Sequence, residues 1–248
     1  MKRSFDRVAD RYDATRGGEA RGRAIAQDLH PYFTEQNPLL EIGIGTGVVA
    51  NGLHELGRSV VGVDIGIEMA KRATERIGRR IAVGDAEWLP IGSCMVTNVY
   101  TVWVLQLLDI DAVLREAARV LKPGGRYVVS QTSDLEPNAL QQITTRLRRE
   151  LGQAARDAKF EAHSLAARAE GVGFRLIYEG WGSLQRFELR PDEVATNIET
   201  RVHSFLWDLD DERWAKIVEP AIAELRALPD AHRPVRCGSR AQVVVFER

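Results

Sequence analysis

The residues best suited to chemistry in this chain are two acids and three glycines that fall close together near its start. Glu41 directly precedes the alternating glycines Gly43, Gly45 and Gly47, and Asp64 ends the next apolar segment. Glycines let the backbone approach a ligand where a Cβ atom would collide, and a carboxylate at a strand end accepts hydrogen bonds from ribose hydroxyls. This pattern predicts a nucleotide-binding site.

The spacing of the glycines narrows the kind of nucleotide. A dinucleotide site needs G-x-G-x-x-G, and Val48 stands where the third glycine would be. A phosphate-binding P-loop needs a lysine after its glycines, and none follows here. A carboxylate at Glu41 would repel a pyrophosphate. It suits a cationic ligand that carries an amine and no phosphate.

The pattern resembles the glycine-rich motif of class I S-adenosylmethionine-dependent methyltransferases, and further matching segments follow in the family's order. They are Asp64, Gly84-Asp85-Ala86-Glu87, Thr101 to Gln106, and Val120 to Ser130. The start, Phe5 to Arg16, is similar to the opening of the subgroup that includes the ubiquinone and menaquinone methyltransferases. The resemblance covers roughly residues 5–180 and the last strand.

The resemblance implies S-adenosyl-L-methionine as the cofactor, with Asp64 on the ribose, Asp85 at the adenine amino group and Arg16 near the methionine carboxylate. An arginine can grip a carboxylate with two hydrogen bonds. The cofactor-binding residues expected are Tyr12, Arg16, Glu41, Gly43, Gly45, Gly47, Asp64, Ile65, Met69, Asp85, Ala86, Glu87, Thr101, Val102 and Gln106. Simpler alternatives stay open: Asp85 as the N-cap of a short helix, and Tyr12 and Arg16 as solvated helix residues.

Two positions depart from the family's pattern. Gln106 stands where the family often has histidine, and Thr97 stands where relatives commonly have aspartate in strand four. Glutamine cannot act as a general base at neutral pH. The departures put acid–base chemistry at this strand end in doubt, and they leave cofactor binding intact.

The acceptor side is less explicit. In this family, insertions between the last strands commonly build the substrate pocket, so His203 is the candidate catalytic base and the candidate pocket residues are Trp103, Trp181 and Trp207. Packing in the core or in a lid is the alternative for each of them. Asp208, Asp210 and Asp211 lack partners at metal spacing, so we interpret them as helix N-caps and expect no metal.

Alternating apolar strands and amphipathic helices predict an α/β fold. We expect a Rossmann-like, doubly wound, mostly parallel seven-stranded sheet with helices on both faces and a helical insertion between strands six and seven. The expected strands are Leu39–Ile42, Ser59–Val63, Arg80–Val83, about Thr97–Val102, Arg126–Gln131, Phe174–Trp181 and Ala241–Glu247. Ligands bind such sheets beyond the carboxyl ends of the strands, where the strand order reverses.

The helices are predicted from apolar stripes at helical spacing. We expect helices over residues 4–30, Pro137 to Ala158 and Ser164 to Gly171. Three further helices follow strands one, two and four and have the stripes Val49-Leu53-Leu56, Met69-Ala73-Ile77 and Leu114-Ala117-Leu121. Two helices in the insertion have the stripes Val194-Ile198-Val202-Phe205 and Trp214-Val218-Ile222-Leu225. Pro220 should kink or break the last of these. We expect one methyltransferase domain over 1–248, with 1–30 as a lid and 190–236 shaping the acceptor pocket.

Composition limits the function classes. A length of 248 residues and a net charge of −1 suit one soluble α/β domain without a field that recruits nucleic acid. The basic clusters at 76–80 and 146–149 are interpreted as solvated helix faces, with nucleic-acid contact as the alternative. Only Cys94 and Cys237 occur, which favours a reducing cytoplasm, and no apolar run approaches the roughly 20 residues of a membrane span.

Three function classes follow from these observations. The leading one is methyl transfer to a small-molecule acceptor. The second is the same reaction on RNA or protein, and the third is a non-catalytic protein that binds S-adenosylmethionine.

Overall fold

The computed structural model describes residues 5–6, 9, 12–13, 17–36, 38–153 and 162–248. The chain divides into two compact units. The first, here called the sheet unit, comprises Met1–Ser133, Lys159–Ser183 and Ala241–Arg248. The second, the helical unit, comprises Asp134–Ala158 and Leu184–Arg240, and it contains the expected insertion.

The strands form one eight-stranded sheet with the order β3-β2-β1-β4-β5-β8-β6, and β7 pairs with β8. The strands are β1 Leu39–Ile42, β2 Val60–Asp64, β3 Ile81–Val83, β4 Val96–Val102, β5 Leu121–Leu135, β6 Arg175–Trp181, β7 Gln185–Leu189 and β8 Val235–Glu247. β1 pairs in parallel with β2 and with β4, β2 with β3, and β4 with β5. β8 pairs antiparallel with β6 and β7. Since β1 lies between β2 and β4, the strand order reverses at the carboxyl ends of β1 and β4, where a doubly wound sheet binds its ligand.

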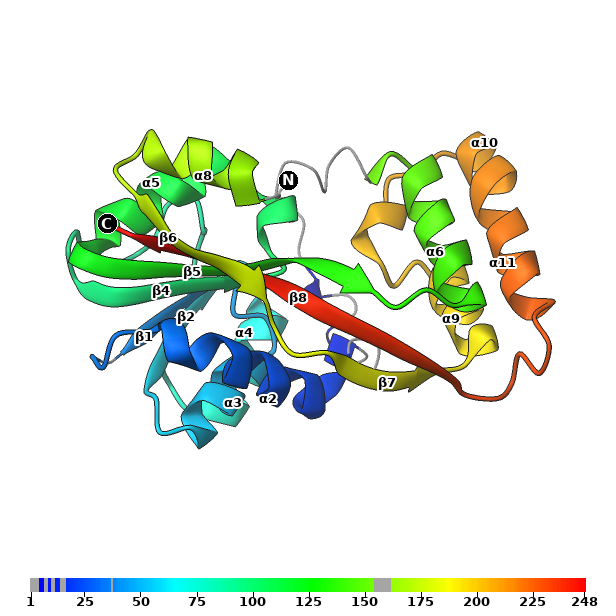
Figure 1. Cartoon of the computed structure of the whole chain (residues 1–248), viewed down its shortest axis with the longest axis horizontal. Helices are drawn as coiled ribbons and strands as arrows, with labels where there is room; N and C mark the ends of the chain where they lie inside the picture. Colours follow the sequence, from blue (N-terminus) through cyan, green and yellow to red (C-terminus); the bar gives the residue numbers. More distant parts are fainter. Residues whose placement is uncertain (1–4, 7–8, 10–11, 14–16, 37, 154–161) are drawn as a thin grey trace. The chain divides into compact units, whose positions relative to one another are not determined.

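Helices cover both faces of the sheet in the sheet unit (Figure 1). They are α2 Gly18–Leu29, α3 Val48–Glu55, α4 Ile67–Ile77, α5 Ile110–Val120 and α8 Ala162–Glu170, with 3-10 turns η2 His30–Tyr32 and η3 Leu105–Leu107. The side chains of α5 and α8 pack with Leu40 and Ile42 in one buried cluster. Those of α2 and α3 pack with Leu39 and Tyr100 in the other. A sheet buried on both faces explains why its parallel strands read as near-continuous apolar runs.

The helical unit has a core of its own. Its elements are α6 Ala139–Glu150, α9 Pro191–Glu199, η5 Ser204–Leu206, α10 Asp211–Arg213, the π-helical turn η6 Trp214–Val218, and α11 Glu219–Arg226. Apolar residues of α6, α9 and α11 form one buried cluster. Pro220 lies in the first turn of α11, where the π-helical turn changes to α-helix; the backbone stays helical at Val218 and Glu219, so the chain does not break at this proline.

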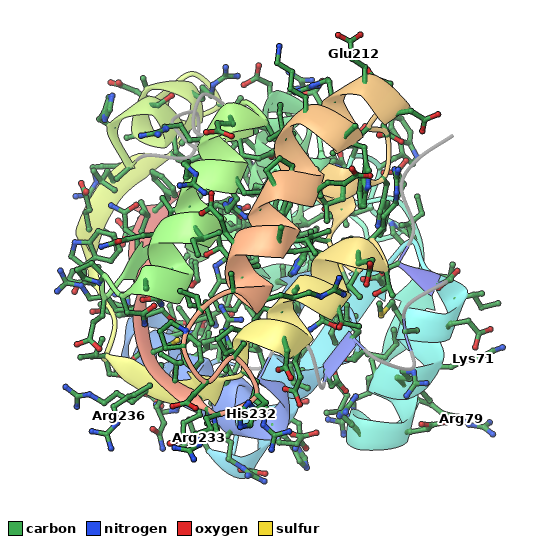
Figure 2. All side chains as sticks on the ribbon, turned by 90° about the vertical axis from the view of Figure 1, so that its right-hand side faces the viewer. Lys71, Arg79, Glu212, His232, Arg233 and Arg236 are labelled. Atoms are coloured by element: carbon green, nitrogen blue, oxygen red, sulfur yellow. The ribbon has the colours of Figure 1, made fainter. Side chains whose placement is uncertain are left out.

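Exposed basic side chains mark the connection from α11 into β8. Figure 2 shows His232, Arg233 and Arg236 pointing outward near this connection, and all three are exposed. Lys71 and Arg79, on α4 and just after it, also point outward. Within the described part of the chain, no helix is long and apolar enough to cross a membrane.

The structure corrects several sequence expectations. The sheet gains an eighth strand, β7, which precedes the expected insertion. The helix over 4–30 is not continuous, because Gly17 and Gly18 have φ angles of +84° and +50° and α2 begins only at Gly18. Leu56 lies beyond the end of α3 and is 38% exposed.

Other corrections concern where elements end. Leu121 begins β5 instead of ending α5, and the register between β4 and β5 shifts between Val96 and Asn98, beside the Lys122 to Gly125 segment. Val202 and Phe205 follow α9 and do not belong to it. β8 starts at Val235, so the end of the expected insertion is strand. The expected helix Pro137 to Ala158 begins at Ala139, and its residues 154–158 lie outside the described residues.

Candidate functional site

The glycine loop connects β1 to α3 at the point where the strand order reverses. Gly43, Gly45 and Gly47 have φ angles of +72°, +58° and +81°, a backbone region that residues with a side chain rarely adopt. A Cβ atom on Gly43 would lie 2.5 Å from Cγ2 of Val104. A Cβ atom on Gly45 would meet nothing within 4 Å. Gly43 is therefore required by packing, whereas Gly45 borders open space that a ligand can enter.

Asp64 holds this loop from the end of β2. Its Oδ2 accepts a hydrogen bond from Gly45 N at 2.8 Å, and its Oδ1 accepts one from Gly66 N at 2.8 Å. Burial raises the pKa of Asp64, and the hydrogen bonds from Gly66 and Gly45 partly oppose that rise. Each carboxylate oxygen has two lone pairs, so Asp64 retains the capacity to accept hydrogen bonds from a ligand.

Glu41 lies one residue before the end of β1 and is buried. Tyr100 Oη donates a hydrogen bond to Glu41 Oε2 at 2.7 Å. Burial raises the pKa of Glu41 to about 8; the hydrogen bond from Tyr100 lowers it and the charge of Asp64 raises it further. Two acids of elevated pKa therefore lie at neighbouring strand ends, as functional sites often show.

The segment after β3 forms a tight turn and contains no helix. Asp85 and Trp88 form a β-bridge, and Asp85 Oδ1 accepts a hydrogen bond from Glu87 N at 3.0 Å. The alternative of Asp85 as a helix N-cap is therefore wrong. Ala86 is buried, and Glu87 Oε1 accepts a hydrogen bond from Asp109 N at 3.0 Å, which ties the turn to the start of α5.

Ile65 and Met69, expected near the cofactor, differ in exposure. Ile65 directly follows Asp64 and is 41% exposed, whereas Met69 in α4 is 2% exposed. Ile65 thus presents an apolar surface next to the acid. Met69 contributes to the packing of α4.

The residues at the end of β4 do not all face the same way. Thr101 is fully buried, and its hydroxyl shares a hydrogen bond of 3.0 Å with that of Tyr127, so its side chain does not border the open space. Val102 packs against the cluster beneath α2 and α3. Gln106 donates a hydrogen bond from Nε2 to Trp103 O at 2.5 Å and accepts one from Gln131 Nε2.

Trp103 is strained. Its φ angle is +47°, which is uncommon for a bulky residue. Its N–H donates to Ser130 O at 2.9 Å, and the guanidinium carbon of Arg21 lies 3.8 Å from the centroid of its ring. Such strain clusters at functional sites. The Arg21 contact also attaches α2 to the end of β4.

The N-terminal segment contacts the glycine loop through polar groups that the sequence analysis missed. Thr46 Oγ1 donates a hydrogen bond to Asp13 Oδ1 at 2.5 Å. Arg76 of α4 donates to Thr46 O at 2.6 Å and to Glu19 Oε1 at 2.7 Å, and it also pairs with Asp13. Tyr12 packs edge-on against Phe5, with ring centroids 5.5 Å apart. Arg16 lies outside the described residues.

The residues predicted for the acceptor side are divided between the two units. In the helical unit, His203 stacks on Phe205 at 5.5 Å, and Trp207 Nε1 donates a hydrogen bond to Arg201 O at 2.8 Å. In the sheet unit, Trp103 follows β4 and Trp181 ends β6. β6 lies three strand positions from β4, which corresponds to a spacing of about 14 Å between these two strands. The roles of all four residues stay predictions.

Two further expectations concern aspartates and metals. Asp210 accepts a hydrogen bond from Arg213 N at 2.7 Å and is the N-cap of α10, which confirms the N-cap interpretation for this residue. Among the residues that the structure describes, no cluster of three or more His, Cys, Asp or Glu side chains could hold a metal ion.

Part of the chain is similar in sequence to known methyltransferases. Residues 40–129 match the family model described as a methyltransferase domain. The chain is 34% identical over 157 residues to the ubiquinone/menaquinone biosynthesis C-methyltransferase UbiE of Caulobacter sp. (strain K31), covering 55% of this chain and 62% of that protein. It is 32% identical over 148 residues to the demethylmenaquinone methyltransferase of Tropheryma whipplei (strain Twist), covering 54% of this chain and 59% of that protein.

Solved structures confirm the fold. The geranyl diphosphate C-methyltransferase of Streptomyces coelicolor A3(2) superposes with a TM-score of 0.51 at 18% identity, covering 91% of this chain and 77% of that one. This chain spans about three fifths of the length of the two curated relatives, which match it over 62% and 59% of their lengths. Residues 40–129 are thus similar to a methyltransferase domain, and the chain resembles the class I S-adenosylmethionine-dependent methyltransferases of the ubiquinone and menaquinone subgroup.

Proposed function

We propose that this protein is an S-adenosylmethionine-dependent methyltransferase that acts on a small-molecule acceptor. The observation that carries the proposal is the glycine loop at the point where strand order reverses. Asp64 braces this loop, and Gly45 borders open space. The matched methyltransferase domain covers the same elements, from β1 into β5.

The acceptor groups of the site fit this cofactor. Asp64 has acceptor capacity for two ribose hydroxyls, and exposed Ile65 offers an apolar surface to an adenine ring. Asp85 is proposed to meet the adenine amino group, and Glu41 the ammonium group of the methionine portion. Both acids would repel the phosphates of NAD or ATP, whereas S-adenosylmethionine carries none.

Bound S-adenosylmethionine supplies a sulfonium-activated methyl group that a nucleophilic oxygen, nitrogen, carbon or sulfur can accept. The residues of the chain then mainly bind and align the reactants. Holding a nucleophile at attack distance can supply about 7–11 kcal/mol. Gln106 is committed to Trp103 and Gln131 and cannot serve as a base. His203 is the proposed base for acceptors that are protonated when they attack.

The acceptor pocket is proposed to depend on residues 190–236 and on the N-terminal segment 1–30. Apolar stripes and the aromatic side chains of Trp103, Trp181 and Trp207 suit an apolar or aromatic small molecule. We propose a cytoplasmic location and no nucleic-acid partner, because the net charge is −1 and only two cysteines occur.

The test is a ligand panel followed by turnover. S-adenosylmethionine and S-adenosylhomocysteine should raise the melting temperature, and NAD and ATP should not. A ligand at a hundredfold excess over its dissociation constant stabilises by about 2.7 kcal/mol. A shift with NAD and none with the adenosyl ligands contradicts the proposal. Transfer of a labelled methyl group to quinone-like and prenyl acceptors, against RNA and protein acceptors, then tests the substrate class.

A further inference from the structure

Tyr100 is a buried tyrosine of β4 whose hydroxyl has one function that the structure shows. It donates a hydrogen bond to Glu41 Oε2 at 2.7 Å, and both side chains are almost inaccessible to water. The pKa of Tyr100 is raised well above its ordinary value, first by burial and then by the charge of Glu41. The hydroxyl therefore keeps its proton and acts as a donor.

The strand register places this pair directly beneath the glycine loop. Glu41 pairs with Gly62 on one side and with Tyr100 on the other, and Tyr100 in turn pairs with Val128. Paired residues of neighbouring strands share a face of the sheet. Gly62 has no side chain, and a Cβ atom there would lie 2.4 Å from Cδ1 of Ile44, a residue of the glycine loop. The loop thus packs on the same face as the Glu41 carboxyl group.

Among the residues that the structure describes, no cationic side chain contributes to the pKa of Glu41. Helices α2 and α3 cover this face with apolar side chains of the buried cluster. The charged group that acts on Glu41 from a neighbouring strand end is Asp64, which is also acidic. Beside the loop, Arg76 pairs with Asp13 and Glu19 and donates to Thr46 O, and the Thr46 hydroxyl donates to Asp13. In the described part of the chain, Tyr100 is the side-chain donor to Glu41.

We propose that Tyr100 is a positioning residue for the cofactor: its hydroxyl holds Oε2 of Glu41 and thereby presents the carboxylate to the ammonium group of the bound ligand. This inference rests on the proposed function. Tyr100 does not touch the reacting atoms. Its contribution is to orient Glu41 and to favour the ionised carboxylate, because a hydrogen bond to a charged form stabilises that form.

The proposal predicts that ligand binding is linked to a proton. With a Glu41 pKa of about 8, the carboxyl group is mostly protonated at neutral pH. An ammonium group binds the ionised form, so binding should release a proton from Glu41. Affinity should rise as the pH increases toward 8.

Substituting Tyr100→Phe removes the hydroxyl and leaves the ring. The pKa of Glu41 should then rise by about one pH unit, because a hydrogen bond to a charged group has that strength. The pH at which affinity rises should move up by the same amount, and at neutral pH binding should weaken about tenfold.

The experiment is isothermal titration of S-adenosylhomocysteine in two buffers of different ionisation enthalpy, repeated across a pH range that spans the Glu41 pKa of about 8. The parent should release protons on binding, and Glu41→Gln should not. Tyr127→Phe is the matched control, because Tyr127 is equally buried in the neighbouring strand and its hydroxyl meets Thr101 in the other cluster. It should keep the parental pH profile.

The outcomes separate this inference from the proposed function. If the parent binds no adenosyl ligand, the proposed function fails. If the parent binds and Tyr100→Phe shows the parental affinity and pH profile, Tyr100 does not position Glu41. Should Tyr100→Phe not fold, the parent and Glu41→Gln still decide: equal proton release by both overturns the proposal.

Discussion

Asp64→Ala tests the centre of the proposed site. The substitution removes the acceptors of the 2.8 Å hydrogen bonds from Gly45 N and Gly66 N. It also removes the acceptors proposed for two ribose hydroxyls. Each hydrogen bond between a charged group and a ligand is worth about 1.5–3 kcal/mol. The expected loss of binding free energy is therefore about 3–6 kcal/mol, or at least a hundredfold in the dissociation constant of S-adenosylhomocysteine.

The effect on folding should be much smaller, and the structure indicates why. Each lost loop bond joins a backbone N–H to a charged group, so it contributes about 1.5–3 kcal/mol. Burial raises the pKa of Asp64, so ionising this side chain in the folded protein itself costs free energy, and the substitution removes that cost. The two effects oppose each other, so the free energy of unfolding in urea should fall by clearly less than the sum of the two bonds.

The assay is titration calorimetry of S-adenosylhomocysteine with Asp64→Ala, alongside urea unfolding. The control is Asp111→Ala, which removes an exposed carboxylate of α5 and its 2.8 Å ion pair with Arg168. Exposed pairs contribute about 0–1 kcal/mol, so this variant should bind as the parent does. Parental affinity in Asp64→Ala would refute the placement of the ribose at the end of β2.

Three further predictions follow from the geometry. Gly45→Ala and Gly124→Ala place a side chain at φ +58° and +75° with open space around each, so both should lose about 1 kcal/mol of stability, and calorimetry should show weaker cofactor binding only in Gly45→Ala. Burial raises the pKa of Glu41 to about 8, so its contribution to stability is full at low pH and is lost as the pH rises toward 8. Urea unfolding of Glu41→Gln should lack this decline, which amounts to a few kcal/mol. The same slope of unfolding free energy against pH in both proteins would contradict the burial of an ionisable group there. His203→Ala and Trp207→Ala should lower turnover while leaving S-adenosylhomocysteine affinity unchanged, and full activity in both would leave the acceptor site unlocated.

The parallel part of the sheet was predictable because its signals are local. β1 spans Leu39–Ile42 as predicted, and the strand ends of β2 and β4 lie within a residue of expectation, since strands buried on both faces read as short apolar runs. β7 was missed because Gln185–Leu189 is short and has only two apolar residues, Phe187 and Leu189. The charged pattern predicts a helix over 4–30, but Gly17 and Gly18 interrupt it, because paired glycines favour a turn.

The candidate site was predictable only where its parts are close in sequence. The acid and glycine pattern identified Glu41 and the loop, whose contacts with Asp64 span 19 residues. The hydrogen bond between Tyr100 and Glu41 spans 59 residues, and the pair between Arg76 and Asp13 spans 63. Such pairings depend on strand order and helix placement, which composition and periodicity do not encode. The burial of the Thr101 side chain also depends on strand placement, so the sequence did not predict it.

The charge of the site distinguishes it from other nucleotide sites built on similar sheets. Glu41 and Asp64 both have pKa values raised chiefly by burial, and the charge of Asp64 raises that of Glu41 further. Ionising both carboxyl groups without a partner costs free energy, which a cation bound between strand ends would recover and a phosphate would increase. A glycine loop that approached a pyrophosphate would need backbone donors without a buried acid at the position of Glu41. We therefore expect the buried acids to favour a ligand with an amine and hydroxyl groups.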